Sequence, residues 1–306
     1  MAQAYIRMTQ EHSSKPAIAF LGTGLMGLPM ATRLLDAGFP LHVWNRTAAK
    51  AAPLAQLGAH LHASAAEAAH HAAITISMLE NGDVVRKVLE DQGVAAAMPA
   101  DSLFIDMASI QPEQARAHAQ LLQARGIRTL DAPVSGGTVG AEAGTLAIMV
   151  GGDAADFAAA SAIFAALGRA THVGGHGTGQ LTKLINQMIV GVTIGAVAEG
   201  LLLARKGGAD PAKVREAISG GFADSRILLL HGERMVAQDF APRARMTVQL
   251  KDLRNALATS AQLDFEPPIT RLLHALFEDA CREGFADLDH SALYLALAQR
   301  NGMKQP

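Results

Sequence analysis

A lysine and two amides stand one helical turn apart in the second half of the chain. Lys183 is followed by Asn186 and Gln187 at the third and fourth positions, so a helix would project all three side chains from one face. Such groups are costly to bury on an apolar helix unless a ligand or partner satisfies them. An ammonium group can polarise a carbonyl and donate a proton, which makes Lys183 a candidate general acid, with Asn186 holding it or a substrate. The alternative is a lysine that reaches solvent.

The stretch 177–208 predicts the single long helix that carries these residues. It opens with Gly177-Thr178-Gly179, contains no proline and stops at Gly207-Gly208. This length corresponds to roughly 27 helical residues, about 40 Å at ~1.5 Å per residue. Its apolar run is interrupted by Glu199, so we expect a buried helix rather than a membrane span.

A glycine-rich turn follows the first apolar run, 17–21, and precedes a helical pattern over 28–37. The spacing G-x-G-x-x-G between a strand and a helix is typical of a dinucleotide-binding turn. Its first glycine makes the turn, the second admits a pyrophosphate and the third lets the helix pack on the strand, while free N–H groups meet the phosphates. The alternative is a glycine turn that binds nothing. The predicted cofactor contacts are Gly22, Thr23, Gly24, Leu25, Met26 and Gly27.

The end of the second predicted strand, 41–44, indicates which dinucleotide binds. NAD sites usually place an acidic residue there, whereas this chain has Asn45, Arg46 and Thr47. A guanidinium can bind a 2′-phosphate, and the neighbouring hydroxyl and amide can donate to it. The sequence therefore favours NADP(H). The alternative is that Arg46 stacks on the adenine and NAD(H) is accepted as well.

Strands and helical patterns continue to alternate through the first half, which predicts a parallel sheet covered on both faces. Ligands bind beyond the carboxyl ends of such strands, so Met78, Leu79 and Ser109 are candidate cofactor contacts, with core packing as the alternative for Met78. The further strands are predicted at Ile74–Met78, Leu103–Asp106, Thr129–Asp131 and Leu146–Val150.

The turn that follows Asp131 is a candidate substrate loop. Ser135, Gly136 and Gly137 come two residues after Pro133, and together they offer free N–H groups and a hydroxyl. This chemistry suits a small carboxylate. An ordinary glycine turn is the alternative.

The second half predicts helices only, at 210–218, 246–261, 268–283 and 289–300. The predicted fold is therefore an α/β N-terminal Rossmann-type doubly wound sheet followed by an all-α C-terminal domain. We expect a loose leader over 1–15, an NAD(P)-binding Rossmann domain over 16–176 and a helical substrate and oligomerisation domain over 177–306.

Composition excludes several other classes. The formal net charge is −2 and the basic residues are scattered, which argues against a nucleic-acid partner. Cys281 is the only cysteine, so no intrachain disulfide can form and a reducing, cytoplasmic location is expected, with no membrane association. Histidines at 60, 62, 70 and 71 lack companion carboxylates or cysteines at metal-site spacing, so no metal site is predicted. Arg243 and Arg245 are expected to be rim charges, with contact to an acidic substrate as the alternative.

Four motifs, in this order, resemble those of the β-hydroxyacid dehydrogenase family, and the likeness extends from residue 17 to about 299. They are Gly22-Thr23-Gly24-Leu25-Met26-Gly27-Leu28-Pro29-Met30-Ala31; Asp131 to Gly137 with Gly144-Thr145-Leu146 and Met149-Val150-Gly151-Gly152; Gly177-Thr178-Gly179-Gln180 to Lys183; and Lys251-Asp252-Leu253.

The resemblance implies roles for individual residues. Lys183 matches the family's catalytic lysine, Ser135 to Gly137 its substrate-carboxylate loop, and Ser109 a position beside the nicotinamide. Lys251 matches a lysine at the cofactor and substrate cleft. Gln187 departs from the second asparagine of many members, and with residues 289–293 it resembles the tartronate semialdehyde reductase branch.

The activity implied is reduction of a small 3-oxo acid by hydride transfer from NADP(H), or alternatively NAD(H), with Lys183 as proton donor. A 3-hydroxyisobutyrate, 4-hydroxybutyrate or other hydroxyacid dehydrogenase on the same scaffold is the alternative, and a non-catalytic dinucleotide-binding sensor is the alternative of another class. The family also implies a homodimer or homotetramer, which the apolar composition permits.

Overall fold

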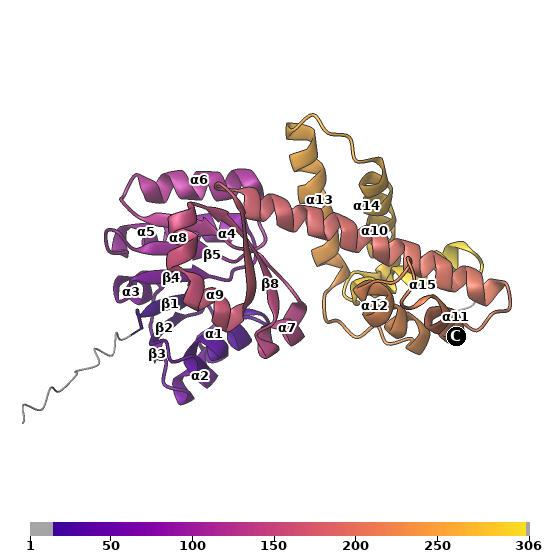
Figure 1. The fold of residues 1–306 in the computed structure, drawn as a ribbon, viewed down its shortest axis with the longest axis horizontal. Coiled ribbons are helices and arrows are strands. Elements are labelled where there is room, and N and C mark those ends of the chain that lie inside the picture. Colours follow the sequence, from indigo (N-terminus) through magenta and orange to yellow (C-terminus); the bar gives the residue numbers. More distant parts are fainter. Residues whose placement is uncertain (1–14, 304–306) are drawn as a thin grey trace, which may run out of the picture.

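The computed structural model describes residues 15–303, which form an α/β domain and a helical domain joined by one long helix (Figure 1). The predicted fold class is thereby confirmed. Residues 1–14 of the expected leader lie outside the described residues. Its last residue, Lys15, places Nζ 4.7 Å from the ring centre of Phe39.

The first domain contains a nine-stranded sheet in which six neighbouring strands are parallel, in the order β3-β2-β1-β4-β5-β6. The order reverses between β1 and β4, and in doubly wound sheets ligands bind at such a switch point, beyond the carboxyl ends of the strands. These strands are β1 (Ile18–Leu21), β2 (Leu41–Trp44), β3 (His60–Leu61), β4 (Ile74–Ser77), β5 (Leu103–Asp106) and β6 (Arg128–Asp131).

The sheet is not parallel throughout, which corrects the prediction at one edge. Strand β8 (Leu146–Gly152) runs antiparallel to both β6 and β7 (Val134–Ser135), while β9 (Gly168–Gly174) pairs with β8 in parallel. Strands β3, β7 and β9 were not predicted. The first two have only two residues, too few to establish an alternating pattern.

Helices cover both faces of the sheet and bury two separate apolar clusters. Residues such as Ile18 and Phe20 pack toward α1 and α9, while their neighbours Ala19 and Leu21 pack toward α3 to α6, as expected from the period of two along a strand. The helices are α1 (Gly27–Asp36), α2 (Ala52–Gln56), α3 (Ala65–His70), α4 (Gly82–Leu89), α5 (Val94–Ala97), α6 (Pro112–Gln123), α7 (Gly137–Ala143), α8 (Ala154–Ala159) and α9 (Ser161–Leu167).

The joining helix α10 (Thr178–Lys206) runs from the sheet into the second domain, where the other helices pack around it (Figure 1). Glycines permit close packing there: a Cβ on Gly195 would lie 2.6 Å from Leu273 Cδ1. Helix α12 was not predicted, and the last two predicted helices begin or end in irregular turns. The remaining helices are α11 (Pro211–Ile218), α12 (Arg226–Ala237), α13 (Met246–Gln262), α14 (Pro268–Ala280) and α15 (Leu293–Arg300).

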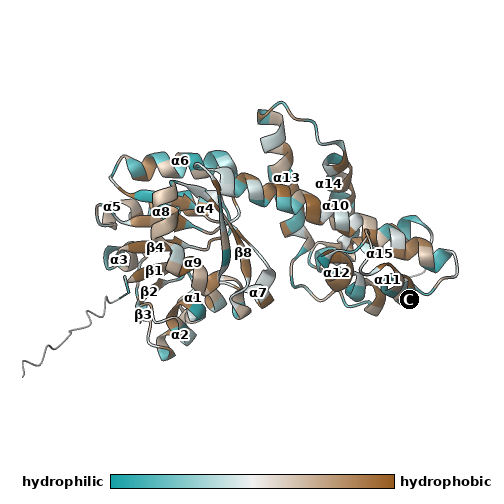
Figure 2. Ribbon diagram, in the orientation of Figure 1, coloured by the Kyte–Doolittle hydropathy of each residue, from teal (hydrophilic) through white to brown (hydrophobic). Residues whose placement is uncertain are grey.

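Helix α10 is apolar on more than the face that it buries. Within residues 15–303 it is the one helix long and apolar enough, by length and composition, to cross a membrane. Ile194, Ala198 and Leu201 lie in the helical core, whereas the side chains of Ile189 and Leu203 are 63% and 73% exposed. Figure 2 shows hydrophobic residues along much of this helix.

Candidate active site

The glycine turn has the geometry that close backbone contact requires. Gly22 has φ +102°, and a Cβ there would lie 2.5 Å from the carbonyl oxygen of Met78. A Cβ on Gly27 would lie 1.9 Å from the carbonyl oxygen of Gly22, so α1 packs against the turn only because both residues lack a side chain. A Cβ on Gly24 would have no atom within 4 Å. The middle of the turn therefore faces open space.

Asn45 fixes the turn to the end of β2. Its Oδ1 accepts a hydrogen bond of 2.9 Å from the backbone N–H of Thr23, and its Nδ2 donates to the carbonyl oxygen of Thr47 over 2.9 Å. Arg46 and Thr47 are exposed. Within residues 15–303 the Arg46 guanidinium has no recorded hydrogen bond or ion pair, so it remains available for a ligand.

The residues around the turn fit a dinucleotide. Helix α1 has no side-chain cap, so its first N–H groups are left to an anion at the positive end of the helix. Leu25 is 80% exposed, and Met26 is half-buried against the core. Met78 and Leu79 follow β4 and lie beside Gly22, and both also pack against core residues.

Lys183 lies near the start of α10, and only 9% of its surface is exposed. Its Nζ donates to Gln187 Oε1 over 3.1 Å, and Asn186 Nδ2 donates to the same oxygen over 2.8 Å. Burial lowers the pKa of the Lys183 amine, an effect that the charge of Asp252 partly offsets. An ammonium has three donors, so with one recorded acceptor in the described chain the others can reach a substrate oxygen.

Asp252 is a functional candidate that the sequence analysis did not single out. It is 2% exposed on α13, and its Oδ2 accepts from Gln187 Nε2 over 2.7 Å. Its Oδ1 lies 3.3 Å from Lys251 Nζ and 3.4 Å from Ser109 Oγ, and Lys251 Nζ also donates to the carbonyl oxygen of Ser109 over 3.3 Å. The signal was present, because Asp252 directly follows Lys251 in a quoted motif.

Asp131 ties the substrate loop to the start of α10. Its carboxylate accepts from the backbone N–H groups of Gly177 over 2.7 Å and Gln180 over 2.9 Å. The Gln180 side chain, fully buried, bonds to the backbone at Ala108 and Ile110, just after β5. The carboxyl ends of β5 and β6 are therefore fixed to the helix that carries Lys183.

The predicted substrate loop lies where β7 ends and α7 begins. Ser135 is half-buried, while Gly136 and Gly137 are exposed with φ values of +140° and +64°. Both values lie in the region that favours glycine. Among the described residues Ser135 makes no recorded side-chain hydrogen bond, so its hydroxyl is available to a ligand.

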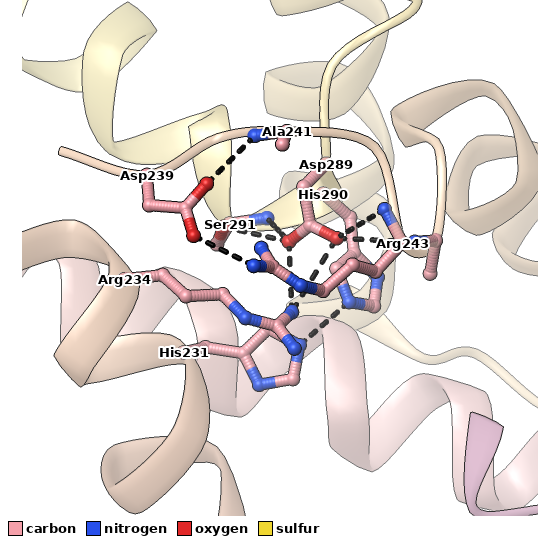
Figure 3. A network of polar contacts seen from close by, with 9 residues as sticks. His231, Arg234, Asp239, Ala241, Arg243, Asp289, His290 and Ser291 are labelled. Carbon is pink, nitrogen blue, oxygen red and sulfur yellow. Dashed lines mark hydrogen bonds and ion pairs between the residues drawn. The ribbon is translucent and has the colours of Figure 1, made fainter. Parts of the chain in front are cut away.

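The two arginines of uncertain role are engaged in ion pairs. Arg243 pairs with Asp239 over 2.7 Å, and Arg245 lies 3.9 Å from Asp287. Figure 3 shows the network around Asp289, which accepts from Arg234 and from the backbone N–H of Ala244. These pairs fit the interpretation of Arg243 and Arg245 as rim charges.

Comparison with known proteins places the whole arrangement in one family. Residues 17–175 match the NAD-binding domain of 6-phosphogluconate dehydrogenase, and residues 177–297 match the NAD-binding domain of NADP-dependent 3-hydroxyisobutyrate dehydrogenase. A 2-hydroxy-3-oxopropionate reductase of Escherichia coli is 42% identical over 92% of this chain and 96% of its own length. A 3-hydroxyisobutyrate dehydrogenase of Pseudomonas aeruginosa is 36% identical over 92% and 97% of the two chains.

A solved structure supports the same assignment. The 3-hydroxyisobutyrate dehydrogenase of Mycobacterium tuberculosis, determined with L-serine, has a TM-score of 0.86 and 33% identity, and the match covers 92% of this chain and 99% of that one. With this fold, a glycine turn that fits a dinucleotide and a buried lysine at the domain junction, the chain is an NAD(P)-dependent oxidoreductase that belongs to the β-hydroxyacid dehydrogenase family.

Proposed function

We propose that the protein reduces the aldehyde of a small 3-oxo acid, and that this substrate is tartronate semialdehyde, which yields glycerate. The observation that carries the reaction type is the buried ammonium of Lys183, with one recorded acceptor in the described chain. The substrate is supported by the name of the Escherichia coli relative and by Gln187 at the second amide position.

Each chain residue has a defined task in this reaction. The nicotinamide, when bound, supplies the hydride that the aldehyde carbon gains. Lys183 Nζ donates a proton to the aldehyde oxygen, so a C=O bond becomes a CH–OH group. Because negative charge develops on that oxygen in the transition state, the nearby cation lowers the barrier. In the reverse direction the neutral amine takes the proton, and the lowered pKa of Lys183 makes this form more accessible.

The substrate carboxylate is assigned to Ser135, Gly136 and Gly137, whose hydroxyl and N–H groups suit an anion. Asn186 is held against Gln187 and is placed to orient the lysine or the substrate. Ser109 and Lys251 contact each other and Asp252 at the junction of the two domains, where we assign them to the nicotinamide side.

NADP(H) is the proposed cofactor. The support is the exposed Arg46 guanidinium at the end of β2, where an acidic residue would repel a 2′-phosphate. The family description matched by the helical domain also names an NADP-dependent enzyme.

Three small aldehyde acids decide the substrate. Purified protein with NADPH is assayed against tartronate semialdehyde, methylmalonate semialdehyde and succinate semialdehyde, and the highest kcat/KM is expected for the first. A clear preference for methylmalonate semialdehyde would instead make the protein a 3-hydroxyisobutyrate dehydrogenase, like its Pseudomonas aeruginosa relative. Lys183→Ala is expected to lower kcat by orders of magnitude while NADPH binding, followed by fluorescence, is retained. Near-normal turnover in this variant would exclude Lys183 as the proton donor.

A homodimer or homotetramer is also proposed. Apolar side chains of α10 and α14 remain exposed, among them Ile189, Leu203, Ile269 and Leu272. Their burial against a second copy would remove apolar surface from water. Analytical ultracentrifugation tests this, and a monomer at micromolar concentration would contradict it.

A further inference from the structure

Histidines converge at the edge of the sheet, far apart in sequence but close in space. His42 lies in β2, His62 follows β3, and His71 follows α3. The ring centres of these three are 5.1 Å (His42–His62), 5.3 Å (His42–His71) and 5.3 Å (His62–His71) apart. Two more histidines flank the triangle: His60 lies 5.3 Å from His42, and His70 lies 5.3 Å from His71.

One histidine of the triangle has a carboxylate partner. His62 Nδ1 lies 3.3 Å from Glu67 Oε1, and Glu67 Oε2 is fixed by a 3.2 Å hydrogen bond from the backbone N–H of Ala63. The expectation that these histidines lack a companion carboxylate was therefore wrong for His62. Sequence spacing did not reveal the contact because β3 and α3 are joined by a tight turn.

The carboxylate determines which nitrogen of His62 is free. With its proton on Nδ1, shared with Glu67, His62 presents the lone pair of Nε2, and this atom lies 2.9 Å from His42 Nδ1. A carboxylate that orients a histidine in this way is the usual second partner of a metal-bound imidazole. Burial, followed by the charges of His62, His60 and His71, lowers the pKa of His42, so the neutral ring needed for coordination is favoured.

The spacing of the triangle matches that of a metal site. Three imidazoles bound to one tetrahedral ion at about 2.0–2.1 Å have ring centres about 5 Å apart and neighbouring nitrogens about 3.3 Å apart. The observed ring centres already meet the first value, and the His42–His62 nitrogens are short of the second by a few tenths of an ångström. Rotation of the rings about their side-chain bonds is the rearrangement required.

We propose that His42, His62 and His71 bind a divalent transition-metal ion such as Zn²⁺, with Glu67 orienting His62 and water completing a tetrahedral site. His71 is exposed, which gives the ion a path from solvent. The ion joins the two-residue edge strand β3 to β2 and to the end of α3. Its expected effect is on stability, because none of these residues belongs to the proposed catalytic or cofactor contacts.

A second group, His231, Asp289 and His290, places its ligand atoms within 4.8 Å of one another. Its carboxylate is already occupied, since Asp289 accepts from Ser291, Ala244 and Arg234. Arg234 also places a positive charge where a cation would have to sit. This group (Figure 3) is therefore not a competing metal site.

The test uses full-length protein that carries no histidine tag and has been treated with chelator. Titration with ZnCl₂ by calorimetry is expected to show one ion per chain with a dissociation constant in the micromolar range or below. Co²⁺ in place of Zn²⁺ is expected to give the intense visible absorption of a tetrahedral site. His62→Gln and His71→Ala are each expected to weaken binding at least tenfold, and His70→Ala, an adjacent exposed histidine outside the triangle, is the matched control.

Thermal unfolding provides a second measurement. Zn²⁺ is expected to raise the Tm of the wild-type protein and of His70→Ala but not that of the His62→Gln/His71→Ala double variant, since a ligand that binds only the folded state stabilises it. Circular dichroism and NADPH turnover show whether the double variant is folded. The proposal is overturned by binding only at millimolar Zn²⁺, or by a folded double variant that binds as tightly as the wild type.

Discussion

Gln187 Nε2 donates a hydrogen bond of 2.7 Å to Asp252 Oδ2, and so joins α10 to α13 beside the catalytic lysine. The other end of the same amide accepts from Lys183 Nζ over 3.1 Å. The carboxylate thus acts on the lysine through a neutral amide, and no direct ion pair between them is recorded within residues 15–303. The ammonium is held in place while its charge stays available to the substrate oxygen.

Replacing Gln187 by methionine tests this positioning role. Methionine has a similar length but cannot accept from Lys183 or donate to Asp252, so the lysine loses its fixed direction and the carboxylate loses a donor. A fall in kcat of about 10- to 100-fold is expected, which corresponds to about 1.4–2.7 kcal/mol of barrier, with NADPH affinity little changed. Gln187→Asn, which keeps the amide on a shorter side chain, is the control. Equal activity of wild type and Gln187→Met would show that the amide does not position the lysine.

The pH dependence of reduction should report the amine of Lys183. Its pKa is lowered mainly by burial, so the ammonium needed for proton donation is lost at a lower pH than for an ordinary lysine. The kcat/KM for aldehyde reduction is expected to fall as pH rises through this pKa, and that for alcohol oxidation to rise over the same interval. The measurement is a pair of pH–rate profiles.

A matched variant identifies the titrating group. In Lys183→Arg the guanidinium stays charged throughout this range, so the residual reduction activity should no longer fall with rising pH. A fall that persists unchanged in Lys183→Arg would assign the titration to another group.

Local sequence patterns predicted the parts of the fold that depend on neighbours along the chain. The spacing of Gly22, Gly24 and Gly27 predicts a turn, and the φ of Gly22 and the tight contact of Gly27 are what such a turn requires. The long helix was expected from an uninterrupted run without proline, and α10 begins and ends within two residues of the expected limits.

Contacts between distant segments could not be predicted in this way. Gln187 and Asp252 are 65 residues apart and meet only because α10 and α13 pack together. His42 and His62 meet because β3 pairs with β2, and β3 is too short to be recognised as a strand. The antiparallel position of β8 likewise depends on its pairing with β6, which its own sequence does not encode.

Arg46 is predicted to set the cofactor preference. A charge-assisted hydrogen bond to a 2′-phosphate contributes about 1.5–3 kcal/mol, so Arg46→Leu should raise the KM for NADPH by roughly 10- to 150-fold and leave the KM for NADH nearly unchanged. Steady-state kinetics with both cofactors make the comparison. If wild type and variant discriminate equally between them, Arg46 does not bind the phosphate.

Asp131 is predicted to stabilise the junction of the two domains. Its carboxylate caps the start of α10 through Gly177 and Gln180, and Asp131→Ala would leave both N–H groups buried without acceptors. We expect a loss of about 2–4 kcal/mol of unfolding free energy, at about 1–3 kcal/mol for each unsatisfied group. Asp131→Asn, which retains one acceptor oxygen, should lose less. Urea unfolding measures both, and equal stability of wild type and Asp131→Ala would refute the capping role.

Asp106, at the end of β5, should make stability depend on pH. Burial raises its pKa to about 7, against hydrogen bonds from Ser77 Oγ and the Ala108 N–H that lower it. A pKa raised on folding gives stability that is present in full below the unfolded pKa of about 3.9 and is lost as pH rises through 7. The difference of about three units corresponds to at most about 4 kcal/mol.

Asp106→Asn separates this effect from the other titrations. Asparagine can keep the acceptor for Ser77 and Ala108 but carries no charge, so the variant should gain stability relative to the wild type between pH 5 and pH 8. Asp131, whose pKa is also raised by burial, is unchanged in both proteins and cancels in the difference. Urea unfolding at the two pH values provides the measurement. A stability difference between the two proteins that does not change with pH would mean that Asp106 is ionised throughout, and the buried end of β5 would then have to hold a charge at pH 5.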